Sequence, residues 1–168
     1  MLEDKRIIVT GSARGMGLAT LTAFVQAGAR VVGMDINDAD GEQAARDANA
    51  LGPGKATYLH IDIADKSSVE TAFQEAVNWL GGLDVLAHPA AIQAGSAASD
   101  VSVEHWDQMF AVNVRGTMIT NQAAYHHMKA AGGGSIINFG SISGQRAEPG
   151  AVAYSASKGA VHSWTRSA

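Results

Sequence analysis

The feature that most constrains this chain is a glycine-rich turn between two short apolar runs near its start. Residues 6–10 contain Ile7-Ile8-Val9 and lead into the turn, residues 11–17. Residues 18–27 then follow a helical pattern, and residues 31–35 read as a second buried strand. A strand, a glycine turn, a helix and a second strand within about 30 residues are what a dinucleotide-binding βαβ unit requires.

Three glycines of the turn, at positions 11, 15 and 17, have the spacing G-x-x-x-G-x-G. Glycine lets the backbone turn tightly and approach a pyrophosphate closely. The N-terminus of the following helix presents free N–H groups and a positive dipole end to that anion. The pattern therefore predicts that Gly11, Gly15 and Gly17 form a phosphate cradle. A tight strand-to-helix turn without a ligand is the structural alternative.

Asp35 ends the second predicted strand. A carboxylate there can accept both hydroxyls of an adenosine ribose and repels a 2′-phosphate, which favours NAD over NADP. Arg14, in the phosphate turn, argues mildly for NADP; Asp35 has more weight because its charge lies at the ribose. The alternative for Asp35 is a simple turn residue. Asp62 is a candidate for the adenine amino group or, equally, a surface turn residue.

The rest of the chain alternates strands with helices. Further strands are predicted at 57–62, 83–87 and 135–139, and helices at 39–51, 67–80, 103–130 and from 154 onward. Ser67 and Glu70 form a predicted capping box. Such alternation implies a parallel sheet covered on both faces. We therefore predict one α/β domain over residues 1–168, a Rossmann-type, doubly wound parallel sheet of about five strands in three α/β/α layers.

Composition argues against several other classes. The net charge is −4 with no basic block, so nucleic-acid binding has no electrostatic footprint. There is no cysteine, which excludes disulfides and thiolate chemistry. Adjacent His126 and His127 point to different helix sides, and we predict no metal site. Without a signal-peptide pattern or an apolar run near the roughly 20 residues of a membrane span, a cytoplasmic protein without membrane contact is expected.

A tyrosine and a lysine near the end of the chain are spaced as Tyr154-x-x-x-Lys158. On a helix, such residues share a face, with Cβ atoms about 5–6 Å apart. A free phenol has a pKa of about 10 and is a poor proton carrier at pH 7, but a nearby ammonium favours the phenolate. The pair therefore suggests a general acid/base. By itself the spacing is also compatible with coincidence.

The glycine pattern at 11–17, the acidic strand end at Asp35, Ser141 and the Tyr154–Lys158 pair occur together in this order. Over essentially the whole chain, this combination resembles the classical short-chain dehydrogenase/reductase family. The resemblance implies hydride transfer between a nicotinamide cofactor and a carbonyl or secondary alcohol. It also implies that Tyr154 is the acid/base, that Lys158 assists it and holds the nicotinamide ribose, and that Ser141 hydrogen-bonds the substrate oxygen.

The same resemblance assigns further roles. Asn113 matches an asparagine that holds a water in a proton relay to the lysine, and Ser141 and Tyr154 bind the substrate, a small-molecule alcohol or ketone. In the family, the long helix and the Tyr–Lys helix form a subunit interface, so a homo-oligomer, dimer or tetramer, is expected. The implied cofactor-binding residues are Gly11, Ser12, Arg14, Gly15, Met16, Gly17, Asp35, Ile36, Asp62, Ile63, Ala90, Tyr154 and Lys158.

Two departures from the family pattern stand out. After the fourth strand the family usually has Asn-Asn-Ala-Gly, whereas this chain has His88-Pro89-Ala90-Ala91. Pro89 lacks an N–H and Ala91 cannot cheaply adopt a glycine-only conformation, so we expect altered cofactor contacts there. The family also continues beyond the last helix with a sixth strand, a substrate-binding segment and a seventh strand. We therefore expect this chain to be a fragment or a natural short form.

Two functional hypotheses result. The leading one is an NAD-dependent alcohol dehydrogenase or ketone reductase that uses Asn113, Ser141, Tyr154 and Lys158. The second is a non-catalytic nucleotide-binding or interaction module, motivated by the two departures. NADP preference through Arg14 is a minor variant of the first. Steroids, sugars, acyl thioesters and small cyclic ketones all stay open as substrates.

Overall fold

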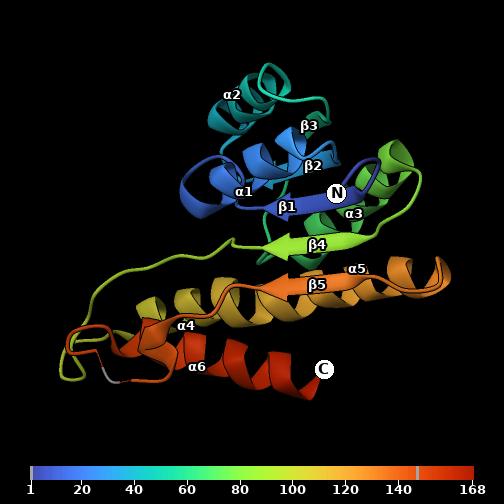
Figure 1. The fold of residues 1–168 in the computed structure, drawn as a ribbon. Helices are drawn as coiled ribbons and strands as arrows, with labels where there is room; N and C mark the ends of the chain where they lie inside the picture. Colours follow the sequence, from blue (N-terminus) through green and yellow to red (C-terminus); the bar gives the residue numbers. More distant parts are fainter. Residues whose placement is uncertain (1, 147) are drawn as a thin grey trace.

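Five parallel strands form a sheet in the computed structural model, which describes residues 2–146 and 148–168. Their order is β3-β2-β1-β4-β5. The strands are β1 (Arg6–Thr10), β2 (Arg30–Asp35), β3 (Lys55–His60), β4 (Val85–His88) and β5 (Ser135–Asn138). Since all neighbours are parallel, the carboxyl ends meet at one edge, and Figure 1 shows the arrowheads of β1, β4 and β5 pointing to the same side.

Helices cover both faces of this sheet. They are α1 (Gly15–Gln26), α2 (Asp38–Asn49), α3 (Lys66–Leu80), α4 (Val103–Phe110), α5 (Thr117–Ala130) and α6 (Val152–Ser167). A π-helical turn, η1 (Ala111–Gly116), joins α4 to α5, and a 3₁₀ turn, η2 (Ile142–Gly144), follows β5. Within residues 2–146 and 148–168, no helix has both the length and the apolar character that crossing a membrane requires. The predicted five-stranded Rossmann-like α/β fold is confirmed.

Side chains that alternate along the strands fill two separate hydrophobic cores. On one face, Ile8 and Leu86 pack with α3 and α5, where Phe73 is fully buried. On the other face, Ile7 and Val9 pack with α1 and α2. Successive strand residues point to opposite faces, so a continuous apolar run such as Ile7-Ile8-Val9 supplies both cores at once.

The strand order reverses between β1 and β4. On one side of this point the sheet continues from β1 to β2 and β3, and on the other side it continues from β4 to β5. Open parallel sheets bind ligands beyond the carboxyl ends of the strands at such a switch point. Here the turns after β1 and β4 meet. A Cβ added at Gly11 would lie only 2.8 Å from the Ala90 Cα atom.

Two local predictions need correction. α3 begins at Lys66 and is capped by Asp65, whose carboxylate accepts the Ser67 N–H at 2.9 Å. The capping box predicted at Ser67 and Glu70 is therefore wrong, because Asp65 is an equally good cap two residues earlier. The helix predicted at 103–130 has the right ends, but its middle widens into the π-helical turn η1.

Candidate active site

The glycine-rich turn between β1 and α1 forms a tight cradle. Gly11 and Gly15 have φ values of 62° and 56°, in the left-handed region that favours glycine. A Cβ at Gly17 would lie 1.8 Å from the Gly11 carbonyl oxygen, so only glycine lets the helix pack this closely on the turn. The N-cap residue of α1, Arg14, makes no side-chain capping bond. The first N–H groups of α1 are therefore available to an anion.

Asp35 ends β2, and two backbone N–H groups fix its carboxylate. The Ala13 N–H donates to Oδ2 at 3.0 Å, and the Asn37 N–H donates to Oδ1 at 3.0 Å. The first bond ties Asp35 directly to the glycine turn. A carboxylate has about four acceptor sites, so both oxygens keep capacity for further donors such as ribose hydroxyls. The structure thus places a fixed negative charge beside the cradle.

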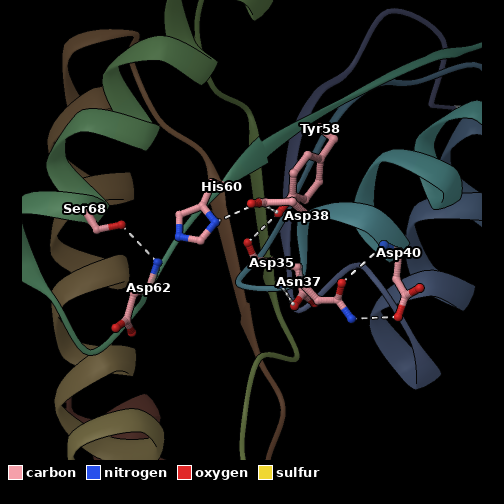
Figure 2. Close-up of polar contacts among 8 residues, drawn as sticks. All are labelled: Asp35, Asn37, Asp38, Asp40, Tyr58, His60, Asp62 and Ser68. Atoms are coloured by element: carbon pink, nitrogen blue, oxygen red, sulfur yellow. Dashed lines mark hydrogen bonds and ion pairs between the residues drawn. The ribbon is translucent and has the colours of Figure 1, made fainter.

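A hydrogen-bonded cluster that the sequence analysis did not identify supports Asp35 from β3 (Figure 2). The Tyr58 hydroxyl lies 2.7 Å from the Asp35 carbonyl oxygen and 2.7 Å from Asp38 Oδ1. His60 Nδ1 lies 2.7 Å from the same Asp38 oxygen. The Tyr58 hydroxyl, and then His60, hold the pKa of the Asp38 carboxyl below its usual range. Burial and the Asp38 carboxylate raise the pKa of Tyr58. Asp38 therefore adds a second negative charge near Asp35.

Asp62 lies just beyond the carboxyl end of β3, at the same edge of the sheet as Asp35. Its N–H donates to Ser68 Oγ at 2.9 Å, as Figure 2 shows. Its Oδ1 accepts the Ala64 N–H at 2.9 Å. The carboxylate therefore does serve as a turn residue. Oδ2 makes no hydrogen bond with the described residues, so the adenine contact stays a prediction beside this turn role.

Two predicted cofactor residues turn their side chains into the core. Ser12 is fully buried, and its hydroxyl has no hydrogen-bond partner among the described residues. A Cβ at Gly33 would lie 2.7 Å from that hydroxyl oxygen, so Ser12 faces β2. Ile63 is 6% exposed and packs against Gly116. In this conformation, contact of either residue with a cofactor involves its backbone.

Met16 and Ile36 show the opposite behaviour, because their apolar side chains are exposed at the sheet edge. Each is 63% exposed. Ile142, in the loop after β5, is 64% exposed and was not singled out by the sequence analysis. Ligand sites commonly combine apolar lining residues with a few convergent polar groups. The three exposed side chains are suited to such a lining.

Tyr154 and Lys158 lie one helical turn apart on α6. Lys158 Nζ is 5.9 Å from the centroid of the Tyr154 ring and donates a 2.7 Å hydrogen bond to the Phe139 carbonyl oxygen. Lys158 is only 5% exposed, and this burial lowers the pKa of its ammonium group. The i,i+4 arrangement predicted from the sequence is confirmed.

Ser141 lies in the loop after β5 and caps η2. Its hydroxyl oxygen accepts the Ser143 N–H at 3.2 Å, which leaves the hydroxyl proton free to be donated. Its backbone N–H donates to His162 Nε2, on α6, at 3.2 Å. A Cβ at Gly144 would lie 2.6 Å from the Lys158 carbonyl carbon, so η2 packs directly on α6. Within the described residues, no hydrogen bond joins the Ser141 hydroxyl to the Tyr–Lys pair.

Asn113 is 1% exposed and lies in η1. Its side-chain amide pairs with Ile92 in both directions, since Oδ1 accepts the Ile92 N–H and Nδ2 donates to the Ile92 carbonyl, each at 2.9 Å. Nδ2 also lies 3.0 Å from Ser157 Oγ, on α6. π-Helical turns are frequent at functional sites. Asn113 thus joins the segment after β4 to the Tyr–Lys helix, while its role in a water relay stays a prediction.

The segment 88–91, where the chain departs from the family pattern, begins with a buried histidine. His88 is 3% exposed, and its Nδ1 lies 2.8 Å from Thr10 Oγ1. Burial, and secondarily the Lys158 charge, lower the pKa of His88 to about 3, so the ring is neutral at pH 7. Ala91 has no positive φ, so the backbone does not use the glycine-only conformation here. The histidine replaces the expected asparagine as a polar group between β4 and β1.

Fold and site together define a class, a Rossmann-like α/β protein with a dinucleotide-type cradle at the switch point of its sheet. A family model described as short chain dehydrogenase matches residues 5–168. The chain therefore belongs to the short-chain dehydrogenase family, as its sequence pattern predicts. This is an oxidoreductase family, and membership implies a nicotinamide cofactor, NAD or NADP.

Named relatives and solved structures agree with this assignment. Cyclopentanol dehydrogenase of Comamonas sp. (strain NCIMB 9872) is 38% identical over 165 residues, 98% of this chain and 66% of that protein. Sorbitol dehydrogenase of Cereibacter sphaeroides is 39% identical, over 99% of this chain and 64% of that protein. A crystal structure of a short chain dehydrogenase from Mycobacterium smegmatis matches with a TM-score of 0.95 at 28% identity, over 99% of this chain and 70% of that one. The chain thus spans about two thirds of the length of its named relatives.

The residues present fit such a cofactor on grounds independent of the family match. A Cβ at Gly15 would meet no atom within 4 Å, so the cradle is open on that side. The uncapped start of α1 offers N–H donors to a pyrophosphate. The fixed Asp35 carboxylate offers acceptors to ribose hydroxyls.

Proposed function

We propose that this protein transfers a hydride between NAD(H) and a secondary alcohol or ketone, with Tyr154 as the acid/base. The observation that carries the proposal is the buried ammonium of Lys158, one turn from Tyr154 and bonded to the Phe139 carbonyl. Lys158 makes no ion pair with a carboxylate of the described residues, and a buried cation without such a partner opposes folding because its desolvation is costly. Such a group at the ligand-binding edge of a sheet points to chemistry rather than to stability.

Each residue has a distinct role in this proposal. When bound, the nicotinamide supplies the hydride chemistry itself. Tyr154 gives a proton to the carbonyl oxygen in reduction and removes one from the alcohol in oxidation, and the Lys158 ammonium stabilises the phenolate. Ser141 donates its free hydroxyl proton to the same substrate oxygen. General acid–base catalysis of this kind contributes about 10²–10⁴-fold.

The proposed cofactor is NAD rather than NADP. Asp35 is fixed beside the cradle, and Asp38 lies three residues further along with a carboxyl pKa held low. A 2′-phosphate bound at this corner meets two like charges. Arg14 is exposed and makes no ion pair with the described residues. In the NADP alternative, its guanidinium binds the 2′-phosphate.

Two measurements on the 168-residue protein test this proposal. NADH and NADPH are titrated separately, with cofactor fluorescence as the signal, and we expect tighter binding of NADH. Turnover is then followed by NADH formation with cyclopentanol, sorbitol and a panel of other secondary alcohols. The first two are chosen from the names of the relatives. Tighter binding of NADPH contradicts the use of Asp35, and turnover that is unaffected by Tyr154→Phe contradicts the mechanism.

A second candidate function is nucleotide binding without turnover. It is favoured by the replaced segment 88–91 and by the match to only about two thirds of the relatives' length. This candidate predicts saturable NADH binding and no product from any alcohol or ketone tested. Turnover by a chain whose mass corresponds to 168 residues excludes it.

We also propose that two copies of the chain associate through α5 and α6. A groove of about 810 Å³ runs between α4, η1, α5 and α6. Met118, Val161 and Trp164 are in its lining, and Asp107 and Arg115 are among its polar residues. A two-fold interface lets the acidic residue of one copy face the basic residue of the other. Sedimentation equilibrium should show a dimer or tetramer, which Ala160→Glu, at a half-buried residue of the same groove, converts to monomer; a monomeric wild type contradicts the proposal.

A further inference from the structure

Helix α6 holds the loop after β5 at two successive points. Lys158 Nζ bonds the Phe139 carbonyl at 2.7 Å, and one helical turn later His162 Nε2 accepts the Ser141 N–H at 3.2 Å. Residues four apart on a helix share a face. The two contacts therefore hold alternate residues of a short segment, in which Ser141 is extended with φ −154° and ψ 150°. The second contact involves a histidine that the proposed mechanism does not use.

Gly140, between these two points, is shaped to admit the histidine. A Cβ at Gly140 would lie 2.1 Å from His162 Nε2 and 2.5 Å from Cδ2. Gly140 has no positive φ, so its backbone conformation is open to any residue. The close approach of the imidazole, rather than a special backbone turn, is therefore the structural reason for glycine at this position.

We propose that His162 is a positioning residue for Ser141 in the reaction proposed above, on which this inference rests. For Nε2 to accept a hydrogen bond, the neutral ring carries its proton on Nδ1. Nδ1 is buried without a partner among the described residues, so the bond to Ser141 is the one hydrogen bond that the ring makes with them. His162 fixes the Ser141 backbone, while Ser143 takes one lone pair of its hydroxyl. The hydroxyl proton is left for the substrate oxygen.

Variants of His162 separate positioning from packing. Glutamine places its Oε1 near the position of Nε2 and so keeps an acceptor for the Ser141 N–H. Leucine has no acceptor, and asparagine is too short to place one there. Hydrogen exchange of the Ser141 backbone amide, followed by NMR, reports the contact without any turnover. We expect exchange about tenfold faster in His162→Leu and within about threefold of wild type in His162→Gln. Equal protection in wild type and His162→Leu overturns the inference, and His162→Asn replaces the leucine variant if that one does not fold.

Kinetics supply the second readout. We expect kcat of His162→Leu to fall about 10–100-fold, because a misplacement of about 1 Å can cost 10²-fold. NADH affinity and KM should change little, and His162→Gln should recover most of kcat. His126→Leu, the same exchange at an exposed position of α5, is the control. A glutamine variant as impaired as the leucine variant overturns the inference. If wild type has no turnover, the proposed function fails and the positioning role fails with it, while the exchange data still decide whether His162 holds Ser141.

Discussion

The Lys158 ammonium donates a 2.7 Å hydrogen bond to the carbonyl oxygen of Phe139, the residue that follows β5. This bond fastens the helix of the Tyr–Lys pair to the end of the sheet and keeps the cation buried beside the Tyr154 ring. A position that is costly for stability and useful for acid–base chemistry is expected at an active site.

Replacing Lys158 with methionine removes this cation. We predict that Lys158→Met lowers turnover by at least about 10²-fold. The free energy of unfolding should change by no more than about 1 kcal/mol, because loss of the hydrogen bond is offset by removal of a buried charge. Steady-state kinetics and urea unfolding measure the two effects. Lys129→Met, an exposed lysine on α5, is the matched control. Comparable activity in the two variants contradicts the role of Lys158.

Asp35→Asn tests the choice of cofactor. The amide oxygen can still accept from one of the two backbone N–H groups, of Ala13 or of Asn37, and the charge at the ribose corner is removed. We expect NADH to bind about tenfold more weakly, a loss of about 1.4 kcal/mol, and NADPH to bind more tightly than it does to wild type. Fluorescence titration measures both. Asp47→Asn, on the exposed face of α2 away from the cradle, should change neither affinity. An unchanged NADH to NADPH ratio in Asp35→Asn argues against the assignment.

Two glycines of the cradle should differ in their tolerance of alanine. In Gly17→Ala the new Cβ meets the Gly11 carbonyl oxygen at 1.8 Å, so α1 must move off the turn. We predict a loss of at least about 2 kcal/mol of stability together with loss of NADH binding. In Gly15→Ala the Cβ meets nothing within 4 Å, so the cost is that of a left-handed alanine, about 1–2 kcal/mol. Urea unfolding ranks the variants, and a larger loss for Gly15→Ala contradicts the close packing at Gly17.

His88 should make stability depend on pH. Its pKa is about 3 in the folded protein, against an ordinary value of 6.5. Between these values the unfolded chain binds a proton that the folded chain does not, so stability falls as pH falls from 6.5, by roughly 1 kcal/mol per pH unit. Above pH 6.5 the titration of His88 no longer changes stability, since the ring is neutral in both the folded and the unfolded state. The measured quantity is the unfolding free energy of wild type minus that of His88→Asn. It should be lower at pH 5 than at pH 7. A constant difference contradicts the buried, neutral ring.

The fold could be predicted because its signals are local. Each strand is a short apolar run bounded by turn residues, and the glycine spacing at 11–17 is recognisable without any partner. Errors occurred where two local signals compete, as at the start of α3, where Asp65 caps the helix in place of Ser67. Periodicity also could not reveal η1, because the π-helical turn coincides with contacts between Asn113 and Ile92, 21 residues away.

The sequence predicts the motif residues of the candidate site but not the residues that hold them in place. Tyr154 and Lys158 are separated by one helical turn, so their proximity follows from spacing alone. The contacts of Tyr58 with Asp35 and of His162 with Ser141 join different elements and have no signature in the sequence. The glycine at position 140 was the one available hint of a close neighbour, yet its partner is visible only in three dimensions.

The central claim is that Tyr154 is the acid/base, and the most direct test is turnover of Tyr154→Phe beside the control Tyr125→Phe, which alters an exposed tyrosine on α5. The account predicts that Tyr154→Phe loses at least about 10²-fold in kcat, while its NADH affinity and unfolding midpoint stay close to those of wild type. Tyr125→Phe should retain full activity. Turnover by Tyr154→Phe at the rate of the control would contradict the account.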